Sequence, residues 1–276
     1  MRIGLIADWL NPCISQAIDR VREMGTTLDV IFADQELVRL DTVRVRHDLY
    51  VLKSGTEAAL SLAGMLHAEG GATLNPYPVV ARMRNKLLVT HALQAAGLAV
   101  PESYMTSNLD DVQALLSSGP LILKPHRGSR GEGILIVHCA DELRNLASGG
   151  PTLVQRYHTP DGPDRKLYRI GDRVAGVLRR WPLRSYEDKV GEPFDPDDEL
   201  CEIAFRCGDV FGIDLYGIDV VISEGRPFIV DMNKFGSFVG VPDGPRLIAD
   251  YLVNAAYGRG GTAAWRNTWI PAVRSM

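Results

Sequence analysis

The chain has 276 residues, of which 46% are hydrophobic and 23% charged, a globular composition that excludes a disordered, collagen-like or fibrous protein. This length predicts one large or two small domains, because a single hydrophobic core stops growing at roughly 250–300 residues. Thirty Lys and Arg residues against 34 Asp and Glu residues give a formal charge of −4. That balance excludes a generally basic nucleic-acid binder, so any bound anion must be held by a local cluster of cations.

The cysteines and the apolar runs indicate where the protein resides. The four cysteines form no C-x-x-C pair and are too few for a disulfide scaffold, so we expect reduced, mostly buried thiols. They are Cys13, Cys139, Cys201 and Cys207. The first apolar run, residues 3–7, is too short for a signal-peptide core, and no window approaches the roughly 20 apolar residues that span a bilayer. We therefore expect a cytoplasmic protein with no membrane partner and no nucleic-acid partner.

Residues 1–75 alternate between short apolar runs and stretches with helical spacing. The expected strands are residues 3–7, 28–32 and 49–52, and the expected helices are residues 14–24 and 57–67. Strands that alternate with helices predict a parallel sheet with helices on its faces. We expect this stretch to form a first α/β domain.

The pattern changes after the punctuating segment Asn75-Pro76-Tyr77-Pro78. One helix is expected over residues 79–96, before Gly97. Strand-like runs joined by short turns follow at residues 121–124, 133–138, 152–156, 166–170 and 173–178, with one helix over 141–147. Such strand-rich stretches predict an antiparallel α+β unit.

The last third of the chain begins with a segment that lacks periodicity. Residues 181–198 contain three prolines and six acids, which predicts a mobile loop. The expected elements after it are a helix over 198–211, strands over 215–223 and 227–232, and a helix over 246–257. The tail after residue 258 has little periodicity, and no internal repeat is found.

A glycine-rich segment joins two of the expected strands. Its notable residues are Lys124, Arg127, Gly128, Arg130, Gly131 and Gly133. Glycines at this spacing allow backbone N–H groups to turn toward an anion, as in phosphate-binding loops. Because a strand follows rather than a helix, the P-loop and the dinucleotide fingerprint are excluded. The glycines by themselves fit a flexible hairpin turn equally well, and the neighbouring cations favour a triphosphate site.

Three residues with oxygen-bearing side chains lie on an expected hairpin near the end of the chain. Asp231 and Asn233 are two residues apart and so project from one strand face, and Asp219 lies on the partner strand. Carboxylate and amide oxygens suit Mg²⁺, which is usually held by a few carboxylates together with substrate phosphates. The alternative is that these residues only end strands, which is the better explanation for any one of them but not for all three.

Residues 165–184 carry seven Lys or Arg residues and one acid, Asp172. Lys166, Arg179, Arg180 and Arg184 are candidates to meet phosphates or a carboxylate substrate. A solvated sheet face explains Arg165, Arg169 and Arg173 at least as well, and strand alternation allows both interpretations.

In order and spacing these segments resemble the ATP-grasp superfamily over roughly residues 75–257. Arg84-Asn85-Lys86-Leu87, with residues 95–101, is similar to the family's R-D-K-L … A-G-L-P-V-P segment. Lys124-Pro125, with residues 128–133, is similar to K-P … G-S-x-G-x-G. In the family both lysines contact nucleotide, and the glycine-rich loop closes over the phosphates.

Three further segments extend the resemblance. Residues 153–158 resemble the V-Q-E-[FY]-I hinge that holds adenine, and residues 217–219 and 230–233 resemble G-[VI]-D and the metal-binding V-[ED]-[VI]-N. Asn85, Arg156 and Asp231 stand where the family more often has Asp, Glu and Glu. The metal would be Mg²⁺ or Mn²⁺, on Asp219, Asp231 and Asn233.

Two branches of the superfamily are similar to different parts of the chain. The first lysine segment and Arg180 resemble the RimK-like amino-acid ligases, which activate a carboxylate as an acyl phosphate that an amine then attacks. Residues 166–172 and 233–242 resemble instead the inositol-trisphosphate kinase branch, although Gly236 replaces its proline. Fold alone does not decide between them.

The resemblance implies an ATP-grasp fold of α/β and α+β parts. Its expected units are an N-terminal pre-ATP-grasp α/β lobe over residues 1–75, a central subdomain with the glycine-rich loop over 76–158, a C-terminal subdomain with the metal site over 159–260, and a tail over 261–276. The implied activity is an ATP- and Mg²⁺-dependent ligase that joins a carboxylate to an amine or a thiol of a small molecule or peptide. The alternatives are a kinase acting on a polyol or inositol phosphate and an ATP-binding regulatory module, and a homo-oligomer stays open.

The resemblance also implies roles for single residues. The expected ATP-binding residues are Lys86, Lys124, Arg127, Gly128, Ser129, Gly131, Gly133, Gln155, Arg156, Tyr157, His158, Asp164 and Lys166. Within the hinge, Gln155 is expected to face adenine. Lys124 and Arg180 are the expected catalytic residues, with Arg180 on the acyl-phosphate oxygens. The candidates to face the acceptor are Arg179, Arg184, Lys189 and Lys234.

Overall fold

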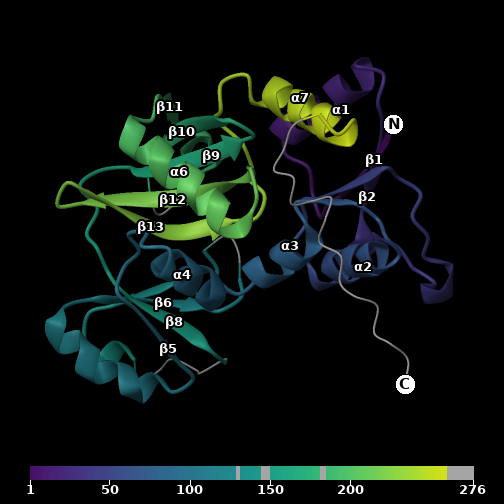
Figure 1. Cartoon of the computed structure of the whole chain (residues 1–276). Helices are drawn as coiled ribbons and strands as arrows, with labels where there is room; N and C mark the ends of the chain where they lie inside the picture. Colours follow the sequence, from purple (N-terminus) through teal and green to yellow (C-terminus); the bar gives the residue numbers. More distant parts are fainter. Residues whose placement is uncertain (129–130, 144–149, 181–184, 260–276) are drawn as a thin grey trace.

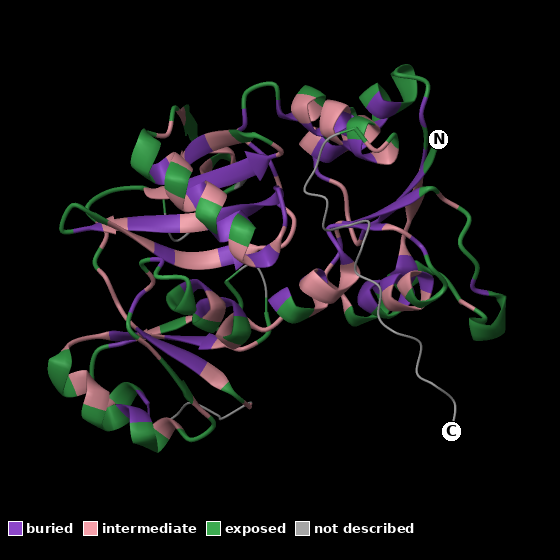
Figure 2. Ribbon diagram, in the orientation of Figure 1, coloured by how far each residue is buried: buried purple, intermediate pink, exposed green. Residues whose placement is uncertain are grey.

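Three sheets organise the chain, each built from a separate stretch of sequence (Figure 1). The computed structural model describes residues 1–128, 131–143, 150–180 and 185–259. Buried residues line the strands and the inner faces of the helices, and the outer helix faces are exposed (Figure 2).

The first sheet is parallel, as the alternating pattern predicted. Its strands are β1 (Arg2–Ile6), β2 (Thr27–Ile31), β3 (Leu49–Leu52) and β4 (Thr73–Leu74), in the order β2-β1-β3-β4. The helices that connect them are α1 (Pro12–Glu23) and α2 (Glu57–Ala68), with short 3₁₀ turns at Ala33–Gln35 and Leu40–Thr42. The predicted elements are confirmed to within two residues, and β4 is an addition.

The single helix predicted over residues 79–96 is wrong. The chain forms α3 (Tyr77–Met83) and α4 (Lys86–Ala95), because Asn85 leaves the helical conformation at φ −101° and ψ 107°. Its side-chain oxygen accepts a hydrogen bond from the backbone N–H of Leu87, so Asn85 caps a new helix. Lys86 is therefore the first residue of α4.

The second sheet is antiparallel, with the order β5-β8-β6-β7. Its strands are β5 (Ser103–Thr106), β6 (Leu121–Pro125), β7 (Leu135–Val137) and β8 (Thr152–Arg156). A 3₁₀ helix over Leu109–Ser118, which the sequence did not predict, packs Val112 against one face. The predicted helix over 141–147 is represented only by a 3₁₀ turn at Ala140–Glu142, and residues 144–149 lie outside the described residues.

The third sheet is antiparallel, with the order β11-β10-β9-β12-β13. Its strands are β9 (Asp164–Ile170), β10 (Arg173–Arg179), β11 (Glu192–Phe194), β12 (Leu215–Ser223) and β13 (Arg226–Asn233). Helix α6 (Asp198–Phe211) covers one face, where Leu200 and Phe211 pack against Leu167, Ile218 and Met232. The opposite face carries the polar side chains described below, and beside them Tyr168, Ile170 and Leu215, which belong to the core shared with α1 and the last helix of the chain.

The loop predicted over residues 181–198 is wrong for its described part, 185–198. Helix α5 (Tyr186–Val190) begins at Ser185, whose side chain and that of Asp188 form a reciprocal capping box, and β11 pairs with β10. Residues 181–184 lie outside the described residues.

The last helix, α7 (Gly244–Ala256), packs on α1 at the other end of the chain (Figure 1). Ile248 and Leu252 share a core with Ile14 and Ile18. We propose that the chain consists of three units, residues 1–75, 76–158 and 159–260. Each sheet lies within one of these units, which supports the division. Helix α7 is an exception, because it packs on the first unit. The predicted tail, 261–276, lies outside the described residues. None of the described helices combines the length and the apolar character that a membrane span requires.

Candidate functional site

The hairpin of β12 and β13 brings the three predicted metal-site residues together. Asp219 and Asp231 are register partners, as are Gly217 and Asn233, so the side chains of Asp219, Asp231 and Asn233 share one face. The amide nitrogen of Asn233 donates to Asp219 Oδ2 at 3.3 Å, which leaves its amide oxygen as an acceptor. This face is opposite the one covered by α6.

Three lysines from three different elements contact this hairpin, two of them through its carboxylates and one through its backbone. Lys86, at the start of α4, donates to Asp231 Oδ1 at 2.7 Å, and Lys166 of β9 donates to Asp219 Oδ2 at 2.7 Å. Lys124 of β6 donates to the Val230 carbonyl at 2.7 Å. The position of Lys86 follows from the cap at Asn85, because an unbroken helix would not begin there.

Burial and charge shift the proton affinities of this cluster. Burial lowers the pKa of Lys124 to about 8, although the charge of Asp231 acts in the other direction. Burial alone would raise the pKa of Asp231, but Lys86 and Lys124 outweigh it and hold that pKa below its ordinary value. Burial and the charge of Asp219 raise the pKa of Asp164 to about 6. Asp231 is therefore an ionised oxygen donor at neutral pH.

Gln155 supports Lys124 directly. Its side-chain oxygen accepts from Lys124 Nζ at 2.8 Å, and its nitrogen donates to Ser103 Oγ at 2.9 Å. Strand alternation sends Arg156 to the opposite face, where its guanidinium donates to the carbonyls of Leu115 and Gly119. The expected contacts of Gln155 and Arg156 with ATP stay predictions.

The rest of the predicted hinge follows β8. The backbone N–H of Tyr157 donates to the Pro120 carbonyl at 3.0 Å. The ring of His158 stacks on Phe228 at a centroid distance of 3.8 Å, and burial lowers the pKa of His158.

The glycine-rich loop is anchored next to Lys86, whose backbone N–H donates to the His126 carbonyl at 2.8 Å. Gly131 and Gly133 have φ angles of 78° and 71°, in a backbone region that residues other than glycine rarely adopt. Gly128 also has positive φ, at 154°. Ser129 and Arg130 lie outside the described residues.

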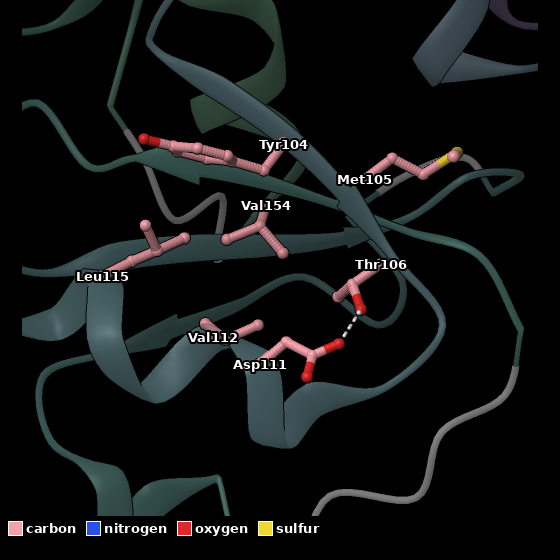
Figure 3. A pocket seen from close by; sticks show the side chains of 7 residues that line it. All are labelled: Tyr104, Met105, Thr106, Asp111, Val112, Leu115 and Val154. Carbon is pink, nitrogen blue, oxygen red and sulfur yellow. Dashed lines mark hydrogen bonds between the residues drawn. The ribbon is translucent and has the colours of Figure 1, made fainter.

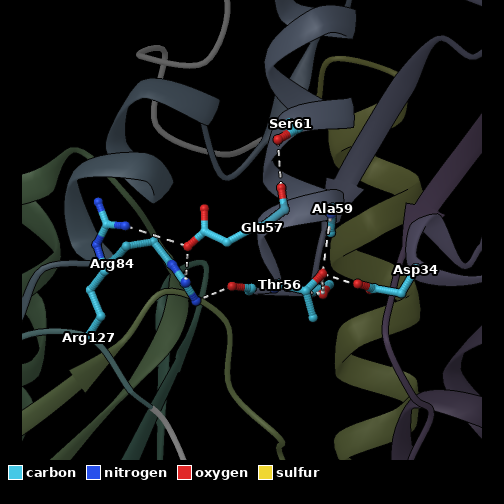
Figure 4. Close-up of polar contacts among 9 residues, drawn as sticks. Asp34, Thr56, Glu57, Ala59, Ser61, Arg84 and Arg127 are labelled. Carbon is cyan, nitrogen blue, oxygen red and sulfur yellow. Dashed lines mark hydrogen bonds and ion pairs between the residues drawn. The ribbon is translucent and has the colours of Figure 1, made fainter. Parts of the chain in front are cut away.

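Two arginines near this loop converge on Glu57 at the start of α2 (Figure 4). Arg84 contacts Glu57 Oε1 at 2.5 Å and also donates to the Gly55 carbonyl, and Arg127 lies 3.6 Å from the same oxygen. The loop after β3 is thereby joined to the region of the three lysines.

Lys234, which follows the hairpin, meets the same loop. A Cβ atom added to Gly55 would lie only 2.3 Å from Lys234 Nζ, so the amine occupies the space that a side chain at that position would fill. Burial, with the charge of Arg84 adding to it, lowers the pKa of Lys234 to about 8.

The sequence analysis missed three residues at the adjacent carboxyl ends of β1 and β3. Lys53 Nζ lies 3.5 Å from Asp8 and 4.6 Å from the centroid of the Trp9 ring, and Lys189 Nζ lies 4.6 Å from that ring. No motif marks Asp8, Trp9 or Lys53. Their position at neighbouring strand ends where the strand order reverses is the signal that could have found them.

Of the two adjacent arginines, Arg179 lies on the face of Lys166 and Asp219. Arg179 pairs in register with Asp164 and donates to Tyr168 Oη at 2.8 Å and to the Val239 carbonyl at 3.0 Å. Arg180 is exposed directly after β10 ends, and the structure does not bring it to the carboxylates. Arg184 lies outside the described residues.

The donor set fits a hard divalent cation. Two carboxylates and an amide oxygen are what Mg²⁺ takes from a protein when phosphates and water complete its coordination. Among the described residues, no group of three or more His, Cys, Asp and Glu side chains could hold a metal, so a closed structural metal site is absent there.

A hollow of about 200 Å³ lies elsewhere, between β5 and the 3₁₀ helix 109–118 (Figure 3). Its lining residues are Tyr104, Met105, Thr106, Asp111, Val112, Leu115 and Val154. Val154 immediately precedes Gln155 on β8 and so faces the other side of the sheet. The hollow is therefore not part of the charged site.

Comparisons with known proteins agree with this geometry. Residues 83–241 match a family model described as "RimK-like ATP-grasp domain". A "Probable alpha-L-glutamate ligase" of Xanthomonas oryzae pv. oryzae (strain MAFF 311018) is 26% identical over 225 residues, 76% of this chain and 75% of the relative.

Solved structures share the fold. An ATP-grasp RimK domain protein from Sphaerobacter thermophilus DSM 20745 has a TM-score of 0.73 at 19% identity, over 91% of this chain and 99% of that one. The ATP-grasp ligase PsnB, complexed with minimal precursor, Mg and ADP, has a TM-score of 0.69 at 18% identity, over 93% of this chain and 98% of that one. These likenesses confirm the predicted ATP-grasp fold.

Proposed function

Because the chain belongs to the RimK-like ATP-grasp family, we propose that it is an ATP-dependent ligase that joins a carboxylate to an amine or a thiol through an acyl phosphate. The observation that carries the proposal is that Lys86, Lys124 and Lys166 all contact the hairpin that holds Asp219 and Asp231. Such an arrangement offers cations to a triphosphate and carboxylates to its metal ion. It suits phosphoryl transfer, in which catalysis is mainly positioning and charge stabilisation.

ATP lies between the second and third sheets in this proposal. The three lysines and the glycine-rich loop contact the triphosphate, and residues 155–158 hold adenine. Asp219, Asp231 and Asn233 would hold the metal ion, Mg²⁺ or Mn²⁺, which when bound neutralises charge on the phosphate oxygens. Lys124 is oriented for its contact by Gln155.

The reaction needs no covalent enzyme nucleophile. An oxygen of the substrate carboxylate attacks the γ-phosphorus, a new P–O bond forms, and the bond to the β-phosphate oxygen breaks to release ADP. The amine then attacks the acyl carbon, a C–N bond forms, and the C–O bond to phosphate breaks as the nitrogen loses a proton. Arg179, on the sheet face of Asp219, Lys189 of α5 and Lys234, directly after the hairpin, are the described candidates to hold the substrate. The predicted role of Arg180 on the acyl phosphate awaits a test.

An amino acid or a peptide is the substrate class that we favour. The relative from Xanthomonas oryzae is named "Probable alpha-L-glutamate ligase", and PsnB was solved with a minimal precursor. Neither the kinase nor the regulatory module is favoured by the family match, and the similarity to inositol-trisphosphate kinase motifs has no support beyond the sequence.

The first experiment measures ATP turnover with amino acids, short peptides and inositol phosphates, with mass detection of the products. We expect ADP and phosphate only when a carboxylate and an amine are both present, with a condensed product. A phosphorylated acceptor would instead identify a kinase.

An Asp231→Asn variant tests the site itself. We expect turnover to fall by at least the roughly 10- to 100-fold that loss of a residue supporting a metal ligand typically costs. Asp172→Asn, at an exposed position, is the matched control and should keep full turnover. Equal turnover in both variants, with circular dichroism showing both folded, would remove Asp231 from the site.

A further inference from the structure

A side chain that directly follows the first sheet connects the two strands of the hairpin that carries Asp219 and Asp231, at the end away from its turn. The last backbone pair of β12 and β13 joins Gly217 to Asn233, and beyond it the two strands no longer pair. Asn75, which directly follows β4 and is 1% exposed, lies at this end.

Asn75 bonds both strands of the hairpin. Its Nδ2 donates to the Leu215 carbonyl at 2.8 Å and to the Lys234 carbonyl at 2.7 Å. Because both partners are carbonyl acceptors, the atom facing them must be the amide nitrogen, and both of its hydrogens are used. Leu215 begins β12 and Lys234 directly follows β13, so the amide replaces the backbone pair that the hairpin lacks there.

A second asparagine holds the chain a few residues further on. Asn11 is also 1% exposed, and its Nδ2 donates to the Ser237 carbonyl at 3.0 Å. Its Oδ1 accepts from the backbone N–H of Ile14 and so caps α1. The segment 234–237, which follows the proposed metal ligand Asn233, is thus held at both ends by residues of the first 75.

We infer that Asn75 and Asn11 are positioning residues that align the metal-binding hairpin through its main chain. The inference rests on the proposed function for what the hairpin binds. A binding constellation must be held to within a fraction of an ångström, and Asn233 and Asp231 lie within three residues of the carbonyl that Asn75 fixes. Neither asparagine donates to the carboxylates themselves, so both act through the backbone.

The test substitutes aspartate at each position and measures binding of the Mn²⁺–ATP complex by electron paramagnetic resonance of Mn²⁺. Asn75→Asp has nearly the same shape but directs an acceptor at two carbonyls. Asn11→Asp keeps an oxygen to cap α1 and loses only the bond to Ser237. We expect Mn²⁺–ATP affinity to fall about 10- to 100-fold in Asn75→Asp and several-fold in Asn11→Asp, in the range typical for residues that support metal ligands.

Two further measurements separate positioning from a general loss of stability. ATP affinity without metal should change less than Mn²⁺–ATP affinity, and raising the Mn²⁺ concentration should restore turnover. Val112, a buried residue of the 3₁₀ helix that packs on the second sheet, provides the control. Val112→Ala should lower stability away from the hairpin and bind Mn²⁺–ATP as the parent chain does.

The outcomes distinguish this inference from the proposed function. If the parent chain does not bind Mn²⁺–ATP, the proposed function fails. If the parent chain binds and both aspartate variants bind equally well, only the inference fails. Should Asn75→Asp not fold, Asn11→Asp decides the question, because it retains the helix cap.

Discussion

Lys124 combines burial with a proposed role in ATP binding. The residue is 5% exposed, and its ammonium group bonds Gln155 and the Val230 carbonyl. Burial lowers its pKa to about 8 from the ordinary 10.5. A buried ammonium group lowers the free energy of unfolding, but it would strengthen the binding of a triphosphate. Loss of its proton at high pH should therefore stabilise the fold and weaken that binding.

Raising the pH above 8 should weaken ATP binding and stabilise the free protein. Between about pH 8 and 10.5 the unfolded chain holds a proton on Lys124 that the folded chain has lost, so the free energy of unfolding rises with pH in this window. ATP affinity falls over the same window, because the free site loses a cation. Urea unfolding and ATP titration at several pH values measure both trends.

Lys124→Met is the control for this pH dependence. It should weaken ATP binding at pH 7 by roughly 1.5–3 kcal/mol, the worth of a hydrogen bond to a charged group. In this variant the free energy of unfolding and the ATP affinity should both change less with pH between about 8 and 10.5. Part of the pH dependence should remain, because the pKa of Lys234 is also lowered to about 8. Unchanged ATP affinity in this variant would place Lys124 outside the nucleotide site.

At the scale of single elements, the start of α4 decides where Lys86 lies. Asn85→Ala removes the acceptor for the Leu87 N–H and should lower the free energy of unfolding by about 0.5–2 kcal/mol. ATP affinity should fall as well, because Lys86 adjoins the cap. Asn85→Asp keeps an acceptor and introduces the residue more usual in the family. Its free energy of unfolding and its ATP affinity should stay close to those of the parent chain. Urea unfolding that gives equal values for the two variants would contradict this role.

Several elements could be predicted from the sequence, and others could not. Strands β1, β2 and β3 and the hairpin of β12 and β13 were found because their apolar runs and turns are local signals. The break between α3 and α4 was missed because apolar spacing continues across Asn85. Helix α5 and β11 were missed because their segment is rich in proline and acids, and its capping box at Ser185 was overlooked.

At the scale of the whole molecule, α1 and α7 join the two ends of the described chain. Leu252 of α7 is buried in the core shared with α1. Leu252→Ala should lower the free energy of unfolding by about 2–5 kcal/mol, because it leaves a cavity in that core. Asn254→Ala, on the exposed side of α7, should change the free energy of unfolding by no more than about 0.5 kcal/mol. Similar urea midpoints for both variants would show that the contact contributes little.

The sequence by itself determined that Asp219, Asp231 and Asn233 share one face, because a hairpin is closed by its own turn and alternation. It also determined the order of motifs by which the fold was recognised. Only the tertiary structure decided which cations contact this hairpin, since Lys86, Lys124 and Lys166 come from different elements. It also revealed Asn75, whose partners lie 140 and 159 residues further along the chain. Periodicity carries no information about contacts at that separation, because they form only when whole sheets pack together.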